Sequence, residues 1–228
     1  MDIQHPGAPD DVAAWRKAER VRLLAQREAI ALDERREADA RITELLLEGF
    51  PLLAGLLVGF YWPFKGEVDP RIAVLRLRER GARAALPLVV EKKAPLRFQE
   101  WWPGCVTQPG VFDLPVPVEG AVVVPDAVLV PPVGFGARGY RLGYGGGYFD
   151  RTLASLSPRP IAIALAREVS RIDTIHPQPH DVPMDFIVTE NGIHQVTPAG
   201  LRPLEPWEAG HIAAALRAER RETPNLRE

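Results

Sequence analysis

The sequence contains the stretch Tyr140-Arg141-Leu142-Gly143-Tyr144-Gly145-Gly146-Gly147-Tyr148-Phe149-Asp150-Arg151, which packs four glycines, three tyrosines, two arginines and one carboxylate into twelve residues. The apolar run Ala127–Val130 precedes it, and a helix-like segment, Thr152–Leu156, follows. This order of strand, glycine loop and helix is typical of anion sites, because glycines let backbone N–H groups approach a phosphate and the helix start adds positive potential. The stretch therefore predicts phosphate binding, although the same glycines would also suit a tight loop that needs only positive φ angles.

The composition predicts a cytoplasmic protein with no nucleic-acid or membrane partner. The chain has 228 residues, 46% hydrophobic, and a formal net charge of −2, which gives no bulk attraction to nucleic acid or anionic lipid. A single cysteine, Cys105, excludes an internal disulfide framework and fits a reducing compartment. No apolar run reaches the ~18 residues of a membrane span, and the polar N-terminus does not resemble a signal peptide. No pattern indicates the oligomeric state.

The chain is predicted to fold as one domain over residues 12–222, with frayed ends at 1–11 and 223–228. Residues 12–47 have a helical pattern that breaks near Leu32-Asp33-Glu34, and residues 205–222 predict a terminal amphipathic helix.

A βαβ unit is predicted from Leu56 to Pro87. Residues 56–61 form an apolar strand, a helix follows over about 70–80, and a second strand covers 82–87. Connections this short between two strands and a helix indicate a parallel sheet. Further apolar strands are predicted at 160–165 and 186–189.

Three arginines share one face of the predicted N-terminal helix. Arg16, Arg20 and Arg27 lie at i, i+4 and i+11, together with apolar residues of the same stripe. Arginines on an inward-facing stripe need an anion or a carboxylate to contact. The alternative is that they lie at the edge of the stripe and pair with neighbouring acids on the surface.

Acidic and aromatic residues in three loops are further site candidates. Glu67 follows the strand 56–61, and ligands of open parallel sheets bind beyond the carboxyl ends of strands. Phe112 lies in a long proline-rich loop and could line a ligand pocket or simply pack. Asp150 and Asp181 could hold Mg²⁺, which takes one or two carboxylates plus substrate phosphates. His176 and His180 are separated by prolines that forbid a helix, so they do not predict a zinc pair.

Standard nucleotide motifs do not describe the glycine stretch. A P-loop requires Gly-Lys-Ser/Thr, and the sequence has no lysine after Lys93. A dinucleotide fingerprint requires a third glycine where Tyr148 stands, and it belongs near a first strand. A nucleotide site of another kind remains.

The motif Gly139-Tyr140-Arg141-Leu142-Gly143-Tyr144-Gly145-Gly146-Gly147-Tyr148-Phe149-Asp150-Arg151 resembles the signature of the 5-formyltetrahydrofolate cyclo-ligase (methenyltetrahydrofolate synthetase) family. The basic helix with Arg16, Arg20 and Arg27 resembles the family's N-terminal helix, Tyr61–Asp69 its Gly-Glu-Val-Asp segment, and His180–Asp185 its closing motif. The resemblance implies a three-layer α/β/α, Rossmann-like fold with a mostly parallel sheet and a long N-terminal helix.

The resemblance also implies an ATP- and Mg²⁺-dependent reaction, in which ATP phosphorylates the formyl oxygen of 5-formyltetrahydrofolate and N10 closes the ring to give 5,10-methenyltetrahydrofolate. It assigns catalysis to Arg141 and Tyr148, and Mg²⁺ to Asp150 and Asp181. Substrate binding falls to Glu67, Phe112 and Tyr148. The residues implied for ATP are Arg16, Arg20, Arg141, Gly143, Tyr144, Gly145, Gly146, Gly147, Tyr148 and Asp150.

The chain departs from the family pattern at a few positions. Gly136 stands where the family commonly has an aspartate, Val116 where it has an acid or amide, and Arg16 where it has a lysine. Arginine and lysine do not bind phosphate in the same geometry. Two other hypotheses therefore remain: an ATP-dependent enzyme for another pterin-like or heterocyclic substrate, and a non-catalytic ligand-binding protein.

Overall fold

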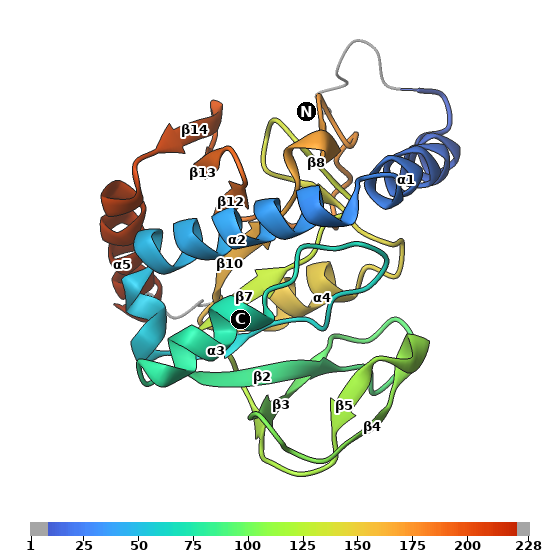
Figure 1. Cartoon of the computed structure of the whole chain (residues 1–228). Coiled ribbons are helices and arrows are strands. Elements are labelled where there is room, and N and C mark those ends of the chain that lie inside the picture. Colours follow the sequence, from blue (N-terminus) through green and yellow to red (C-terminus); the bar gives the residue numbers. More distant parts are fainter. Residues whose placement is uncertain (1–8, 223–228) are drawn as a thin grey trace.

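The computed structural model describes residues 9–222 (Figure 1). The predicted frayed ends, 1–11 and 223–228, lie almost entirely outside the described residues. Within the predicted frayed N-terminus, Asp11 is the N-cap of the first helix, because its side chain accepts a hydrogen bond from the Ala14 N–H. No helix within 9–222 is long and apolar enough to cross a membrane.

A nine-stranded sheet forms the centre of the domain, in the order β14-β13-β12-β10-β7-β1-β2-β3-β6. The five central strands, from β12 to β2, are parallel, and antiparallel strands extend the sheet on both sides. The strands are β1 (Leu57–Gly59), β2 (Arg83–Leu88), β3 (Arg97–Trp101), β6 (Val122–Val123), β7 (Ala127–Val130), β10 (Ile161–Leu165), β12 (Phe186–Thr189), β13 (Gly192–Thr197) and β14 (Gly200–Leu204). The predicted βαβ unit is confirmed, since β1 and β2 pair in parallel.

Helices cover both faces of the sheet. One apolar cluster joins α2, α3 and α5 to the sheet, and a second cluster joins α4 to the opposite face. The helices are α1 (Val12–Glu28), α2 (Leu32–Gly49), α3 (Arg71–Glu79), α4 (Tyr148–Ser155) and α5 (Pro206–Glu222), with 3₁₀ turns at Pro51–Gly55, Val111–Asp113 and Glu168–Ser170. The three-layer α/β/α architecture is thus confirmed.

The predicted long N-terminal helix is two helices, α1 and α2, which Figure 1 shows at an angle to each other. The break lies at Ala29–Ala31, slightly before the predicted position, because Ala31 adopts an extended conformation as the N-cap of α2. Because of this break, α1 does not continue in the helical layer that contains α2. A third apolar cluster contains Leu23 of α1 together with Val133, Leu142 and Ile175, so α1 packs on the loops beyond the sheet.

Two small sheets were not predicted. The proline-rich loop contains the hairpin β4 (Thr107–Pro109) and β5 (Pro115–Pro117). The start of the glycine stretch belongs to a three-stranded sheet in the order β11 (Arg171–Ile172), β8 (Gly134–Gly136) and β9 (Arg141–Leu142). These strands have two or three residues each, which is too short for an alternating pattern to be recognised.

Phe186 tests the packing between β12 and the helical layer. It is fully buried and meets Phe50 edge to face, with ring centroids 5.0 Å apart. We expect Phe186→Ala to lower the free energy of unfolding by about 3–5 kcal/mol, since it leaves a cavity in the core. Urea denaturation measures the change. Val21→Ala is the control, because Val21 is 65% exposed and its truncation should cost under about 0.5 kcal/mol. Equal effects of the two substitutions would contradict the packing described.

Candidate active site

The candidate site lies beyond the carboxyl ends of the parallel strands, where α1 meets three loops. These loops follow β1, contain the glycine stretch, and precede β12. All three contact the arginine stripe of α1, so the stripe faces inward as one of the two interpretations predicted.

Arg16 holds the loop before β12. Its guanidinium forms an ion pair with Asp181, and Nη1 lies 3.3 Å from Asp181 Oδ1. Its Nε donates to the Ile175 carbonyl at 3.0 Å, and Nη2 donates to the His176 carbonyl at 2.9 Å. Every nitrogen of this buried guanidinium therefore contacts a protein acceptor. The expected contact of Arg16 with ATP stays a prediction.

Arg27 and Arg20 connect α1 to the other two loops. Arg27 is buried, and it donates to the Lys65 carbonyl at 2.9 Å and to the Tyr144 hydroxyl at 2.6 Å. The Nε of Arg20 donates to the Gly143 carbonyl at 2.6 Å. Because no other hydrogen bond of Arg20 is made within residues 9–222, its two terminal nitrogens are available at the glycine loop.

The glycine loop, Gly143–Gly147, lies at the surface, and its residues are exposed or half-buried. Gly147 is the N-cap of α4 and adopts a left-handed conformation with φ 62°, and Gly145 has φ 98°, so both positions favour glycine. The amides of Gly143–Gly147 have no acceptor in the part of the chain that the structure describes. A row of exposed, unengaged amides at a helix start is the geometry that binds phosphate.

Arg141 lies beneath this loop and is paired with Asp150. Arg141 is 5% exposed, and its Nη2 lies 3.1 Å from Asp150 Oδ2. A Cβ placed on Gly143 would lie 3.4 Å from Arg141 Nη1, which shows how close the guanidinium is to the loop. The other oxygen, Asp150 Oδ1, accepts from the Val182 N–H at 3.1 Å. Arg141 thus places a guanidinium, held by Asp150, next to the glycine loop.

The two predicted Mg²⁺ ligands come from adjacent segments. Asp150 is hydrogen-bonded to the backbone of Val182, the residue after Asp181. Each carboxylate is also paired with an arginine, Asp150 with Arg141 and Asp181 with Arg16. Within residues 9–222 no group of three or more His, Cys, Asp or Glu side chains converges. Such a pair suits an ion that takes most of its ligands from phosphates and water, as Mg²⁺ does, and the assignment remains a prediction.

Glu67 is a buried carboxyl group at the end of the loop after β1. It is 7% exposed, and its Oε2 accepts from the Phe64 N–H at 2.9 Å. Burial raises the pKa of Glu67 to about 7, although the Phe64 hydrogen bond and the Arg27 charge oppose the shift. The Tyr144 hydroxyl, which accepts from Arg27, also lowers the pKa of Glu67 and so lies close to it. Glu67 is therefore connected to the glycine loop.

An aromatic group forms one wall of the site. Phe64 stacks on Phe112 with centroids 5.8 Å apart, and it lies 6.1 Å from the Tyr144 ring. Phe112 is 68% exposed. Tyr148 instead lies under the loop, because a Cβ on Gly146 would come within 2.8 Å of its ring. The structure brings Phe112 and Glu67 to the same loop cluster, whereas Tyr148 supports the glycine loop from below.

Two residues of this cluster were absent from the predicted site. Arg27 was noted on the α1 stripe, and its spacing from Arg16 and Arg20 was the signal that could have identified it. Phe64 follows β1 just before Glu67, but nothing in the sequence indicated that it would stack on Phe112, which is 48 residues later. Contacts between distant loops leave no periodic pattern.

The departures at Gly136 and Val116 have structural correlates. A Cβ on Gly136 would lie 3.3 Å from Thr174 Cα and 3.4 Å from Ile175 N, so the loop before β12 packs closely on β8 here. Val116 is buried in β5. At Gly136 the backbone of the neighbouring loop occupies the space next to the Cα, and at Val116 the chain has a buried apolar side chain.

Comparison with known proteins agrees with this geometry. The model of the 5-formyltetrahydrofolate cyclo-ligase family matches residues 12–190. The chain belongs to this family. The resemblance carried by the glycine motif is therefore confirmed.

Individual family members match most of the chain. A 5-formyltetrahydrofolate cyclo-ligase of Mycolicibacterium smegmatis is 31% identical over 178 residues, covering 75% of this chain and 91% of the relative. The solved structure of a 5,10-methenyltetrahydrofolate synthetase from Aquifex aeolicus is similar with a TM-score of 0.71, 27% identity and coverage of 83% and 96%. That of the Mycoplasma pneumoniae protein is similar with a TM-score of 0.64, 26% identity and coverage of 77% and 98%.

The raised pKa of Glu67 predicts a pH dependence of stability. The folded protein holds this proton up to about pH 7, whereas the unfolded chain releases it near pH 4.5. The contribution of the protonated Glu67 to the free energy of unfolding is therefore fully present below pH 4.5, and it is lost as the pH rises through 7. Glu67 alone should lower the free energy of unfolding by about 3 kcal/mol over this window, at 1.36 kcal/mol per pKa unit.

Urea denaturation at several pH values between 4.5 and 8 measures this slope. Glu67→Gln should flatten it, because the amide does not titrate. The control is Glu44→Gln, since Glu44 lies exposed on α2. A slope that is unchanged in Glu67→Gln would show that Glu67 is not the buried acid described.

Proposed function

We propose that this chain uses ATP and Mg²⁺ to convert 5-formyltetrahydrofolate to 5,10-methenyltetrahydrofolate. The γ-phosphoryl group passes to the formyl oxygen, N10 attacks the activated carbon, and phosphate leaves. The observation that carries the proposal is the row of unengaged amides at Gly143–Gly147, flanked by Arg141 and Arg20, in a member of the cyclo-ligase family. We further propose that the protein acts in the cytoplasm on a reduced folate.

The glycine loop and its two arginines would bind the ATP phosphates. Transfer of a phosphoryl group requires donors that are already oriented toward the developing negative charge. The amides are fixed by the start of α4, and Arg141 is fixed by Asp150. Arg20 is anchored only through its Nε, so its terminal nitrogens can contact a phosphate bidentately. Mg²⁺ held by Asp150 and Asp181 would neutralise further charge on the phosphates when it is bound.

Glu67 and Phe112 would bind the folate ring system. Because the pKa of Glu67 is about 7, its carboxyl group is partly protonated near neutral pH, and it can donate as well as accept a hydrogen bond to a polar heterocycle. Phe112 and Phe64 offer a stacked pair of rings next to it. This combination of aromatic surface and one buried polar group suits a flat ring with hydrogen-bonding edges.

The direct test is the absorbance of methenyltetrahydrofolate in a mixture of 5-formyltetrahydrofolate, ATP and Mg²⁺. We expect the signal to grow with time and to require both ATP and Mg²⁺. No signal at high protein concentration would contradict the proposal. ATP binding without this product would then favour another heterocyclic substrate, if ATP is consumed, or a ligand-binding protein, if it is not.

Arg20 and Arg22 provide a matched pair of substitutions on α1. Arg20 contacts the glycine loop, whereas Arg22 is exposed and pairs with Glu19. We expect Arg20→Gln to raise the KM for ATP by on the order of tenfold, because it removes a charge-assisted contact to a phosphate. Arg22→Gln should leave the KM unchanged. Steady-state kinetics at saturating 5-formyltetrahydrofolate measure both, and equal KM values would place the ATP phosphates elsewhere.

A further inference from the structure

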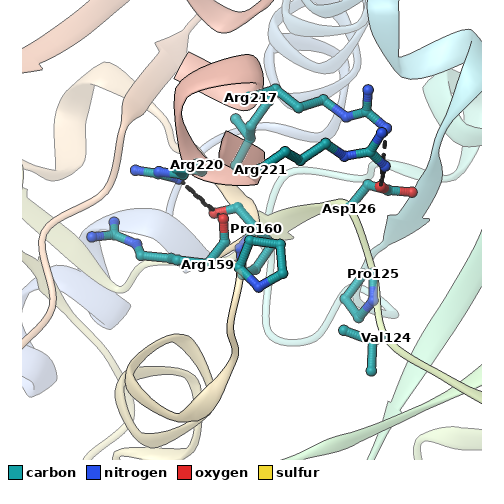
Figure 2. Close-up of a pocket in the computed structure, with 10 residues that line it drawn as sticks. Val124, Pro125, Asp126, Arg159, Pro160, Arg217, Arg220 and Arg221 are labelled. Atoms are coloured by element: carbon teal, nitrogen blue, oxygen red, sulfur yellow. Dashed lines mark hydrogen bonds and ion pairs between the residues drawn. The ribbon is translucent and has the colours of Figure 1, made fainter. Parts of the chain in front are cut away.

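A pocket of about 220 Å³ lies at the edge of the sheet opposite to the candidate active site (Figure 2). Asp126 immediately precedes β7, and Arg159 and Pro160 immediately precede β10, so the pocket lies at the amino-terminal ends of these parallel strands. The glycine loop and Glu67 lie beyond the carboxyl ends. The two sites are therefore separated by the length of the strands.

Four arginines surround this pocket, which we call the arginine pocket: Arg159, Arg217, Arg220 and Arg221. Within residues 9–222, only two carboxylates form ion pairs with them. Figure 2 shows Arg217 and Arg221 converging on Asp126, with distances of 3.1 and 3.0 Å.

Asp185 is shared in the same way. Arg220 lies 2.6 Å from it, and Arg159 lies 3.4 Å from it. The arginines thus outnumber their carboxylates by two, which leaves the pocket positively charged.

The two carboxylates have little capacity left to neutralise this charge. Asp126 Oδ2 also accepts from the Leu57 N–H at 3.0 Å, and Asp185 Oδ2 accepts from the Ala162 N–H at 2.8 Å. The Nε atoms of Arg159 and Arg217 are buried and have no hydrogen-bond partner in the described chain. Burial lowers the pKa of Arg159, and the charge of Arg220 lowers it further. Unsatisfied donors and uncompensated charge at one place favour an added acceptor.

Three of the four arginines of the pocket lie outside the part of the chain that matches the family. The match ends at residue 190, whereas Arg217, Arg220 and Arg221 belong to α5. Only Arg159 lies within the matched region. In Figure 1, α5 lies along the side of the sheet away from α1. The pocket is therefore formed where α5, which lies beyond the matched residues, packs against the amino-terminal ends of β7 and β10.

We propose that the arginine pocket is a second anion site, which binds a small multivalent oxyanion: a phosphate or diphosphate group, either free or carried by a metabolite. Its size supports a ligand of this kind, because sites for drug-sized molecules range from about 300 to 1,000 Å³. Guanidinium groups bind phosphate oxygens bidentately. A bound oxyanion would contact arginines of α5 and Arg159 of the sheet edge at once, and so would fasten α5 to the domain.

The test must separate this site from the glycine loop, which also attracts phosphates. Val124 lines the arginine pocket and is 62% exposed, so Val124→Glu places a carboxylate in the pocket without removing an arginine or disturbing the core. Val124→Gln controls for side-chain size. Val122→Glu controls for added charge, because Val122 is similarly exposed but does not line the pocket. Arg20→Gln perturbs only the glycine loop.

Isothermal titration of the full-length protein with inorganic diphosphate measures binding to each variant. We expect Val124→Glu to weaken the binding of diphosphate at the arginine pocket by on the order of tenfold. Val124→Gln, Val122→Glu and Arg20→Gln should retain this class of binding. Diphosphate at a hundredfold excess over the wild-type Kd should raise the Tm by about 5 °C through this site in the three retaining variants, and by about half as much in Val124→Glu, because its tenfold weaker binding leaves only a tenfold excess. Turnover of 5-formyltetrahydrofolate by Val124→Glu should equal that of the wild type.

Two results would overturn the proposal. The first is diphosphate binding that is identical in Val124→Glu and Val124→Gln. The second is binding that is lost entirely in Arg20→Gln. Arg221→Gln is an additional variant, since this side chain is 56% exposed, and it should weaken the same class. Repeating the titration with inorganic phosphate and with a sugar phosphate distinguishes a free oxyanion from one carried by a metabolite, because contacts to the carrier would tighten binding.

Discussion

The burial of arginines on α1 is the constraint on which the candidate active site depends. A guanidinium removed from water must find acceptors for its N–H groups, and on α1 these acceptors are the carbonyls and side chains of three separate loops. The helix that carries Arg16, Arg20 and Arg27 therefore organises the site as well as contributing to it, and the break before α2 lets α1 reach beyond the sheet.

The central fold could be predicted because its signals are local. Apolar runs such as Ala127–Val130 and Ile161–Leu165 are buried on both faces, which gives a continuous hydrophobic pattern, and short connections require parallel pairing. The hairpin β13–β14 extends the sheet through antiparallel pairs with weaker burial. Its alternation is interrupted by polar residues, so the sequence offered no comparable signal for it.

The candidate site was predictable in its residues and less so in its contacts. Glycines, arginines and carboxylates at the ends of strands identify the segments that meet, and the structure places Glu67, Arg20, Arg141 and Asp150 in one loop cluster. Which arginine pairs with which carboxylate depends on the path of the loops. Arg16 illustrates the difference: its place on the inward-facing stripe called for an anion or a carboxylate, and the fold shows that its nitrogens hold the loop that carries Asp181, while the contact with ATP that the family resemblance implies stays a prediction.

The sites at the two ends of the parallel strands differ in how their arginines are compensated. At the glycine loop, the buried arginines Arg16 and Arg141 are each paired with a carboxylate, and the groups left unengaged are the neutral backbone amides and the terminal nitrogens of Arg20. Recognition there depends on shape and on hydrogen-bond direction. In the arginine pocket, four cations share two carboxylates, so attraction arises from net charge. Because screening by salt weakens exposed charges more than buried, oriented hydrogen bonds, the two sites should differ in their sensitivity to ionic strength. The edge that performs chemistry requires the oriented donors, whereas an edge that only fastens α5 can rely on charge alone.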